Sequence, residues 1–177
     1  MSKTHLHPDR PETERRLEEL LDRGEIADLV ARSLAAIDEG RFDDLRAIYT
    51  EDSSASAPGG QARGRDAIIA QVSRNHTPER RSQHLVGDVI VDLDGDAAQV
   101  RANIFAAFAP TAPDVASPLA PPVEVTFGTV YRYRAVRTPD GWRLSRVEIT
   151  PLWVSGSAEG LLRRAGTEAA PPDVRSR

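Results

Sequence analysis

Residues 83–108 have the sequence QHLVGDVIVDLDGDAAQVRANIFAAF, which predicts two long β-strands joined by a tight turn. The two flanks, residues 83–93 and 97–108, are rich in β-branched and aliphatic side chains, as strands usually are. Asp94-Gly95 between them is a strong hairpin signal, because glycine readily adopts the positive φ of a two-residue turn. This part of the chain is therefore expected to form an antiparallel hairpin.

The chain continues with a second pair of strands and is preceded by helices. Residues 123–136 and 142–153 fit strands around a turn at Thr138-Pro139-Asp140-Gly141. Before the hairpin, apolar residues recur at three- and four-residue steps from about residue 12 up to Gly40, a plausible helix cap. Shorter helices fit residues 42–49 and 65–75. Helices followed by long antiparallel strands predict the α+β class, with the helices packed on one face of the sheet.

Composition limits the function classes that this chain can belong to. Its 177 residues suit one domain, and 40% hydrophobic and 28% charged residues are typical of a globular protein. The absence of cysteine excludes disulfides and thiolate chemistry. A net charge of −4 with interspersed signs favours neither nucleic acid nor a membrane as partner. We see neither a signal peptide nor a membrane span, so a cytoplasmic location is expected.

The chain is expected to divide into three parts: a flexible N-terminus at 1–11, a pocket domain at 12–156 and a polar, partly disordered tail at 157–177. Within the domain, residues 109–122 hold five prolines and are longer than an ordinary hairpin loop. This segment is expected to be a lid or simply disordered, and its role stays open.

Several short segments resemble the SnoaL-like branch of the nuclear transport factor 2-like superfamily, which includes scytalone dehydratase and ketosteroid isomerase. They occur in the family's order between about residues 12 and 156. The segments are residues 35–45 (AAIDEGRFDDL), 49–52 (YTED), 64–68 (GRDAI), 82–88 (SQHLVGD) followed by 94–97 (DGDA), and 140–144 (DGWRL).

The resemblance implies a cystatin-like cone, in which N-terminal helices and a strongly curved, mostly antiparallel sheet enclose an internal pocket. It implies a cofactor-independent acid–base enzyme, such as a cyclase, isomerase or dehydratase, acting on a small, mostly apolar cyclic or polyketide-like metabolite of secondary metabolism. No metal, nucleotide or flavin is implied. The alternative is a non-catalytic module of the same fold that binds a small ligand or dimerises, because one fold hosts many functions.

Asp38 is the first candidate catalytic residue. It lies beside the apolar stripe of the long helix, in the last turn, where the helix dipole disfavours negative charge. Burial and the dipole would both raise the pKa of this carboxyl, as a general acid or base near neutral pH requires. The matching Asp of scytalone dehydratase-like proteins lines the pocket. The alternative is that Asp38 belongs to a solvated polar turn.

His84 is the second candidate catalytic residue. It lies within a predicted strand, and its Gln-His-Leu setting resembles that of the family's pocket histidine. Neutral imidazole can take up and return a proton near pH 7, and a carboxylate partner such as Asp38 would fix its tautomer. The alternative is a half-buried strand histidine that is bonded to the backbone.

Four further residues are candidate substrate-binding residues. Asn103 falls near the place of the family's second histidine, but an amide cannot exchange protons near neutrality, which puts dehydration by a histidine pair in doubt. Tyr49 and Tyr131 are possible hydrogen-bond donors, and Trp153 is expected at the pocket floor or in a subunit interface. A homodimer through the uncovered face of the sheet is expected as well.

Overall fold

The computed structural model describes residues 10–111 and 122–156. The expected flexible terminus and tail lie outside these residues, except that the first helix already begins at Arg10. Most of the proline-rich segment lies outside them too. The helical elements are α1 (Arg10–Asp38), a 3₁₀ helix η1 (Phe42–Ala47) and α2 (Arg65–Asn75). Over these ranges, no helix is long and apolar enough to span a membrane.

Six strands form one sheet in the order β2-β1-β6-β5-β4-β3. All neighbouring strands run antiparallel except β1 and β6, which pair in parallel. The strands are β1 (Tyr49–Ala57), β2 (Gly60–Arg63), β3 (Arg80–Asp94), β4 (Ala97–Pro110), β5 (Val125–Thr138) and β6 (Gly141–Gly156). The predicted α+β cone with a mostly antiparallel sheet is thus confirmed.

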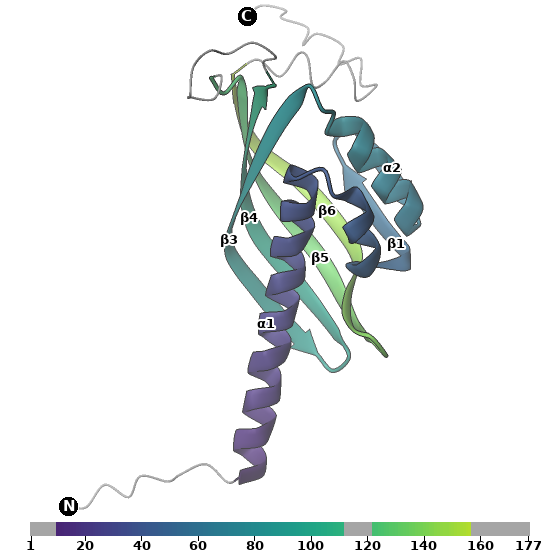
Figure 1. The fold of residues 1–177 in the computed structure, drawn as a ribbon. Helices are drawn as coiled ribbons and strands as arrows, with labels where there is room; N and C mark the ends of the chain where they lie inside the picture. Colours follow the sequence, from purple (N-terminus) through teal and green to yellow (C-terminus); the bar gives the residue numbers. More distant parts are fainter. Residues whose placement is uncertain (1–9, 112–121, 157–177) are drawn as a thin grey trace, which may run out of the picture.

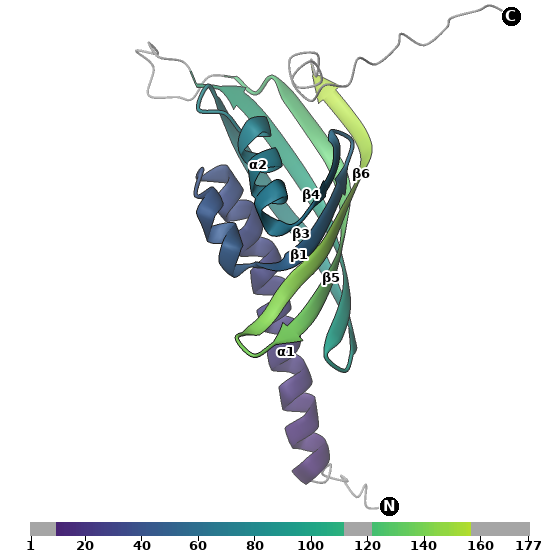
Figure 2. The same ribbon diagram turned by 90° about the vertical axis from the view of Figure 1, so that its right-hand side faces the viewer.

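The helices lie on one side of the sheet, which curves around them (Figures 1 and 2). The C-terminal part of α1 crosses the concave face next to β3, and α2 lies beside β1. The N-terminal part of α1 extends past the sheet in both views. This arrangement places the end of α1 and the start of β3 at the same end of the cone.

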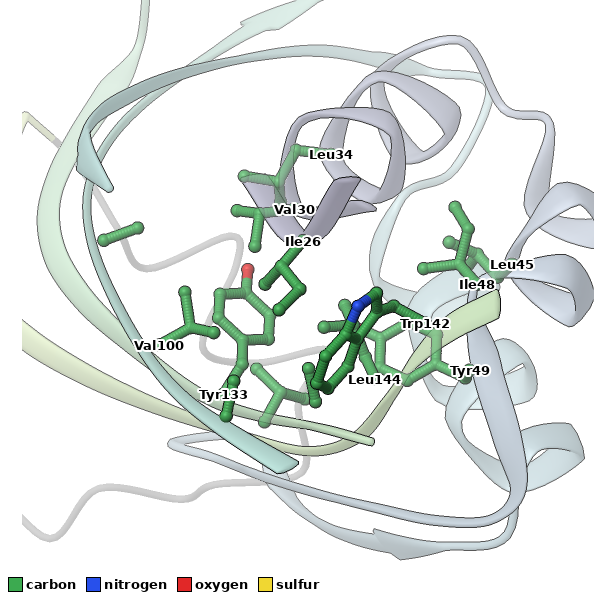
Figure 3. Close-up of a cluster of buried hydrophobic side chains, with 14 of the residues drawn as sticks. Ile26, Val30, Leu34, Leu45, Ile48, Tyr49, Val100, Tyr133, Trp142 and Leu144 are labelled. Carbon is green, nitrogen blue, oxygen red and sulfur yellow. The ribbon is translucent and has the colours of Figure 1, made fainter. Parts of the chain in front are cut away.

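The core is formed between α1 and the concave face of the sheet (Figure 3). Ile26, Val30 and Leu34 recur at four-residue steps on α1 and are almost completely buried, so one stripe of the helix faces the strands. Opposite them lie Tyr133 and Trp142, which are both buried. This packing fixes the C-terminal half of α1 and thereby the position of its last residue, Asp38.

The structure departs from the sequence prediction between residues 42 and 63. The helix expected over 42–49 is a 3₁₀ helix that ends at Ala47, and Tyr49 already belongs to β1. Strands β1 and β2 lie where the sequence predicted no strand. Their sequences, YTEDSSASA and GQAR, are mostly small and polar and show no alternation of apolar residues. They are strands because β1 pairs with β6 at Tyr49 and again over residues 54–56, and β2 pairs with β1.

Candidate active site

Asp38 and His84 are directly hydrogen-bonded to each other. The Nδ1 atom of His84 lies 2.6 Å from Oδ1 of Asp38, and the backbone N–H of His84 donates to Oδ2 at 2.7 Å. The hydroxyl of Ser82 donates to Oδ1 at 2.8 Å. The His84 side chain is 4% exposed and that of Asp38 is 17% exposed. The two predicted catalytic residues therefore form one buried pair, and neither the solvated-turn nor the backbone-bonded alternative describes them.

The end of α1 delivers the carboxylate to this place. Gly40 has a φ of 69°, and its N–H donates to the carbonyl of Ile37 while the N–H of Arg41 donates to that of Ala36. These two bonds are the pattern of a Schellman cap, in which glycine takes the left-handed position that ends a helix. The predicted cap at Gly40 is confirmed. It leaves Asp38 as the last helical residue, with its side chain directed at the edge strand β3.

The charge state of Asp38 corrects the sequence prediction. Burial by itself raises the pKa of Asp38, but the hydrogen bonds and charge of His84, together with the Ser82 hydroxyl, lower it further than burial raises it. The pKa is therefore below its ordinary value rather than above it. The prediction was wrong because the three hydrogen-bond donors to Asp38 could not be read from the sequence. An ionised carboxylate only accepts hydrogen bonds, so Nδ1 of His84 carries the proton that it shares with Asp38.

The His84 ring forms part of the wall of an apolar cavity of about 450 Å³. The rings of Phe108 and Phe127 lie in the same wall, with their centroids 5.8 Å apart, and the Phe108 ring meets the His84 ring edge-on at 6.0 Å. Since Nδ1 is bonded to Asp38, Nε2 is the nitrogen that remains for a ligand. A second cavity of about 610 Å³ is lined by both Asp38 and His84.

Residues 18–148 match the family described as the SnoaL-like domain. The chain belongs to this family. An uncharacterized protein of Mycobacterium tuberculosis is 34% identical over 135 residues, which covers 72% of this chain and 84% of that protein. The similarity predicted from short segments is thus confirmed over most of the domain.

Solved structures with the same fold include three from Novosphingobium species. An NTF2-like protein with a cystatin-like fold from N. aromaticivorans is 28% identical, with a TM-score of 0.65 over 88% of this chain and 97% of its own. A candidate scytalone dehydratase from the same organism has 22% identity and a TM-score of 0.67 over 93% and 99%. The hexachlorocyclohexane dehydrochlorinase LinA-type3 of N. barchaimii has 16% identity and a TM-score of 0.68 over 81% and 95%.

The SnoaL-like cavity contains a second histidine that the sequence analysis missed. His76 follows the last turn of α2, and its ring centroid lies 5.9 Å from that of His84 and 6.0 Å from that of Phe108. The missed signal is the run Asn75-His76-Thr77-Pro78, in which proline marks the end of a helix. A histidine there lies next to the start of the following strand.

Arg80 at the start of β3 also lines this cavity and brings a positive charge to it. Its Nη2 donates to Glu124 at 3.2 Å. Its Nη1 is buried and, among the described residues, has no hydrogen-bond partner. The cavity of this SnoaL-like domain is therefore mostly apolar, with a few polar side chains in its lining, as ligand pockets commonly are.

The four predicted substrate-binding residues occupy different places in the SnoaL-like domain. Tyr131 lines the cavity, and Trp153 lines both this cavity and a further pocket that contains Leu85 and Phe105. Burial and the nearby charge of Asp38 raise the pKa of Tyr131, so its phenol stays protonated and can donate a hydrogen bond. Tyr49 is instead 5% exposed in the hydrophobic core. Asn103 bonds to Asp88 and Arg101 and does not line the cavity. The expected placement of Tyr49 and Asn103 in the cavity is therefore wrong.

No three His, Asp or Glu side chains within residues 10–111 and 122–156 gather as metal ligands would. The expectation that this domain works without a metal stays a prediction.

The low pKa of Asp38 predicts an acid-dependent contribution to stability. A depressed pKa in the folded state stabilises the fold above the ordinary value of 3.8, and this stabilisation is lost as the pH falls below it. Asp38→Asn is expected to lower the free energy of unfolding by about 2 kcal/mol at pH 7. The difference from wild type should shrink as the pH falls below about 4, as measured by urea unfolding.

The control for this prediction is Asp28→Asn. Asp28 lies on the same helix, but its side chain is 67% exposed and its ion pair with Arg32 is at the surface. This variant should unfold within about 0.5 kcal/mol of wild type at each pH. A stability deficit of Asp38→Asn that stays constant down to pH 3 would contradict the account.

Proposed function

We propose that the Asp38–His84 pair is the general base of a cofactor-independent lyase or isomerase. Nε2 of His84 removes a proton from a small, mostly apolar cyclic molecule in the cavity, and Asp38 holds the ring in the required tautomer and stabilises the imidazolium that forms. The observation that carries this proposal is the 2.6 Å contact between Nδ1 and the carboxylate, made by a ring that lines an apolar cavity.

The other cavity residues fit this chemistry. Removing a proton from carbon leaves negative charge on the substrate, which needs a hydrogen-bond donor. Tyr131 and Arg80 both line the cavity, and the protonated phenol or the Nη1 of Arg80, which has no partner among the described residues, can supply one. Two proteins of the same fold are described as a dehydratase and a dehydrochlorinase, whose names denote loss of water and of hydrogen chloride. A polyketide-like substrate and a role in secondary metabolism are further parts of the proposal.

The test uses a generic carbon acid, 5-nitrobenzisoxazole, because its conversion needs only a base in an apolar site. The imidazole takes the C–H proton, the C–H electrons form a nitrile, and the N–O bond breaks so that the oxygen leaves as a coloured phenolate. We expect the protein to accelerate this reaction at least about 100-fold over an equal concentration of free imidazole. A rate no greater than that of free imidazole, despite measurable binding, would favour the alternative of a small-ligand-binding module.

We further propose that this chain forms a homodimer through the outer face of its sheet. Leu85, Phe105, Gly128 and Trp153 are directly opposite one another on four neighbouring strands. The side chains of Leu85, Phe105 and Trp153 are 58%, 40% and 48% exposed. The ring centroids of Phe105 and Trp153 lie 5.9 Å apart. This uncharged row is continuous, and a two-fold axis through it would place the same surface on both partners.

Leu85→Glu is expected to convert the dimer into a monomer, because it places a charge at the β3 end of the apolar row without touching the core. Light scattering coupled to size-exclusion chromatography measures the mass. The matched control is Leu20→Glu, which changes an equally exposed leucine on α1 and should leave the dimer intact. A monomeric wild type, or a dimer that only Leu20→Glu dissociates, would contradict the proposed interface.

A further inference from the structure

His76 presents an unused hydrogen-bond acceptor in the cavity wall. Its Nδ1 lies 3.0 Å from the carbonyl oxygen of Val72, which also accepts the backbone N–H of His76 at 3.0 Å. A carbonyl oxygen only accepts, so Nδ1 must carry a proton. In the neutral ring this leaves the lone pair on Nε2.

The environment of His76 keeps the ring neutral. Burial lowers the pKa of His76, and the nearby His84 lowers it further, against the opposing effects of the Val72 carbonyl and Asp38. Nε2 is completely buried and has no hydrogen-bond partner among the described residues. An unpaired buried acceptor is unfavourable, so a group that supplies the missing donor would bind here favourably.

The protein's own nearby donor does not satisfy this atom. Arg80 lines the same cavity, yet its Nη1 is equally buried and equally without a partner in the described parts of the chain. A donor and an acceptor that both lack partners within the described residues, on two side chains that line one cavity, indicate a site for a ligand with complementary polar groups. The rings of His84 and Phe108 beside His76 make the surroundings of this site aromatic.

We propose that His76 is a specificity-determining residue, whose Nε2 accepts a hydrogen bond from a hydroxyl or N–H group on a ring-shaped ligand bound next to His84. This inference rests on the proposed ligand cavity but not on catalysis. His84 removes the proton from the reacting carbon, whereas His76 selects molecules that carry a donor beside that carbon. A ligand that lacks the donor leaves Nε2 unpaired and binds more weakly.

The experiment compares the binding of two probes of equal size, 2-naphthol and 2-methylnaphthalene, by titration calorimetry. Wild type is expected to bind 2-naphthol about tenfold more tightly, as one additional hydrogen bond allows. In His76→Phe this preference should fall to less than about twofold, while the affinity for 2-methylnaphthalene stays unchanged. His76→Gln, which restores an acceptor, should recover part of the preference. If His76→Phe does not fold, His76→Leu takes its place.

Three results would overturn the proposal. They are a wild type that binds neither probe, a wild type that binds both equally, and a preference that survives in His76→Phe but is lost in His84→Phe. The last result would assign the acceptor to His84 instead. Because the readout is binding, failure of 5-nitrobenzisoxazole turnover would count against the proposed chemistry and leave this test of His76 intact.

Discussion

Replacing His84 with alanine is expected to lower the rate of 5-nitrobenzisoxazole elimination at least about 100-fold, down to the background of solution bases. His84 is the one cavity residue whose ring has a carboxylate on one nitrogen and an apolar cavity beside it. The second histidine, His76, has a carbonyl oxygen as its partner and cannot share a proton with it in the same way. Steady-state rates at neutral pH give the comparison.

His84→Gln separates loss of the base from loss of the side chain's volume. Glutamine fills similar space and can still donate to Asp38, but it cannot take up a proton near neutrality. It should therefore be as inactive as the alanine variant, with an unfolding free energy closer to wild type. Wild-type turnover in either variant would remove His84 from the mechanism.

Asp38→Asn is expected to lower the same rate about 10- to 100-fold while leaving the imidazole in place. The amide nitrogen of asparagine cannot accept from Nδ1, and the ring loses the charge that stabilises its protonated form. The carboxylate also accepts the backbone N–H of His84, and weakening this hydrogen bond in Asp38→Asn makes the position of the ring less fixed. The loss should appear in kcat more than in KM, because Asp38 itself does not line the apolar cavity.

Ser82→Ala is the matched control for this prediction. It removes one of the three donors to Asp38 without changing the carboxylate or the imidazole. Its rate should stay within about threefold of wild type, since the pair itself is intact. If Asp38→Asn were no slower than Ser82→Ala, the carboxylate would have only a structural role.

Most of the fold could be predicted because the long elements have clear periodicities. The apolar residues of α1 recur at helical spacing, and β3 and β4 flank an obvious turn. All three elements were therefore predicted close to their observed bounds. Strand β1 could not be found in this way. Its pairing partner β6 lies about ninety residues away along the chain, and its own small, polar residues do not identify it as a strand.

The pair could be predicted from the family resemblance, whereas the rest of the site depended on details of register. Ala106 pairs with His84 and faces the cavity. Asn103, three residues earlier on β4, pairs with Gly87 and Val130 and therefore faces the other side of the sheet. Adjacent strand residues face opposite sides, so a shift of one position removes a residue from the pocket. His76 was missed because its position depends on the turn between α2 and β3.

The most direct test of the account is the protonation pattern of the His84 ring, measured by proton–nitrogen correlation NMR and assigned by its loss in His84→Gln. At neutral pH we expect a proton on Nδ1, shifted far downfield by the short bond to Asp38. This signal should change in Asp38→Asn. A proton on Nε2 instead, or a ring spectrum that is the same in wild type and Asp38→Asn, would contradict the claim that these two residues act as one base.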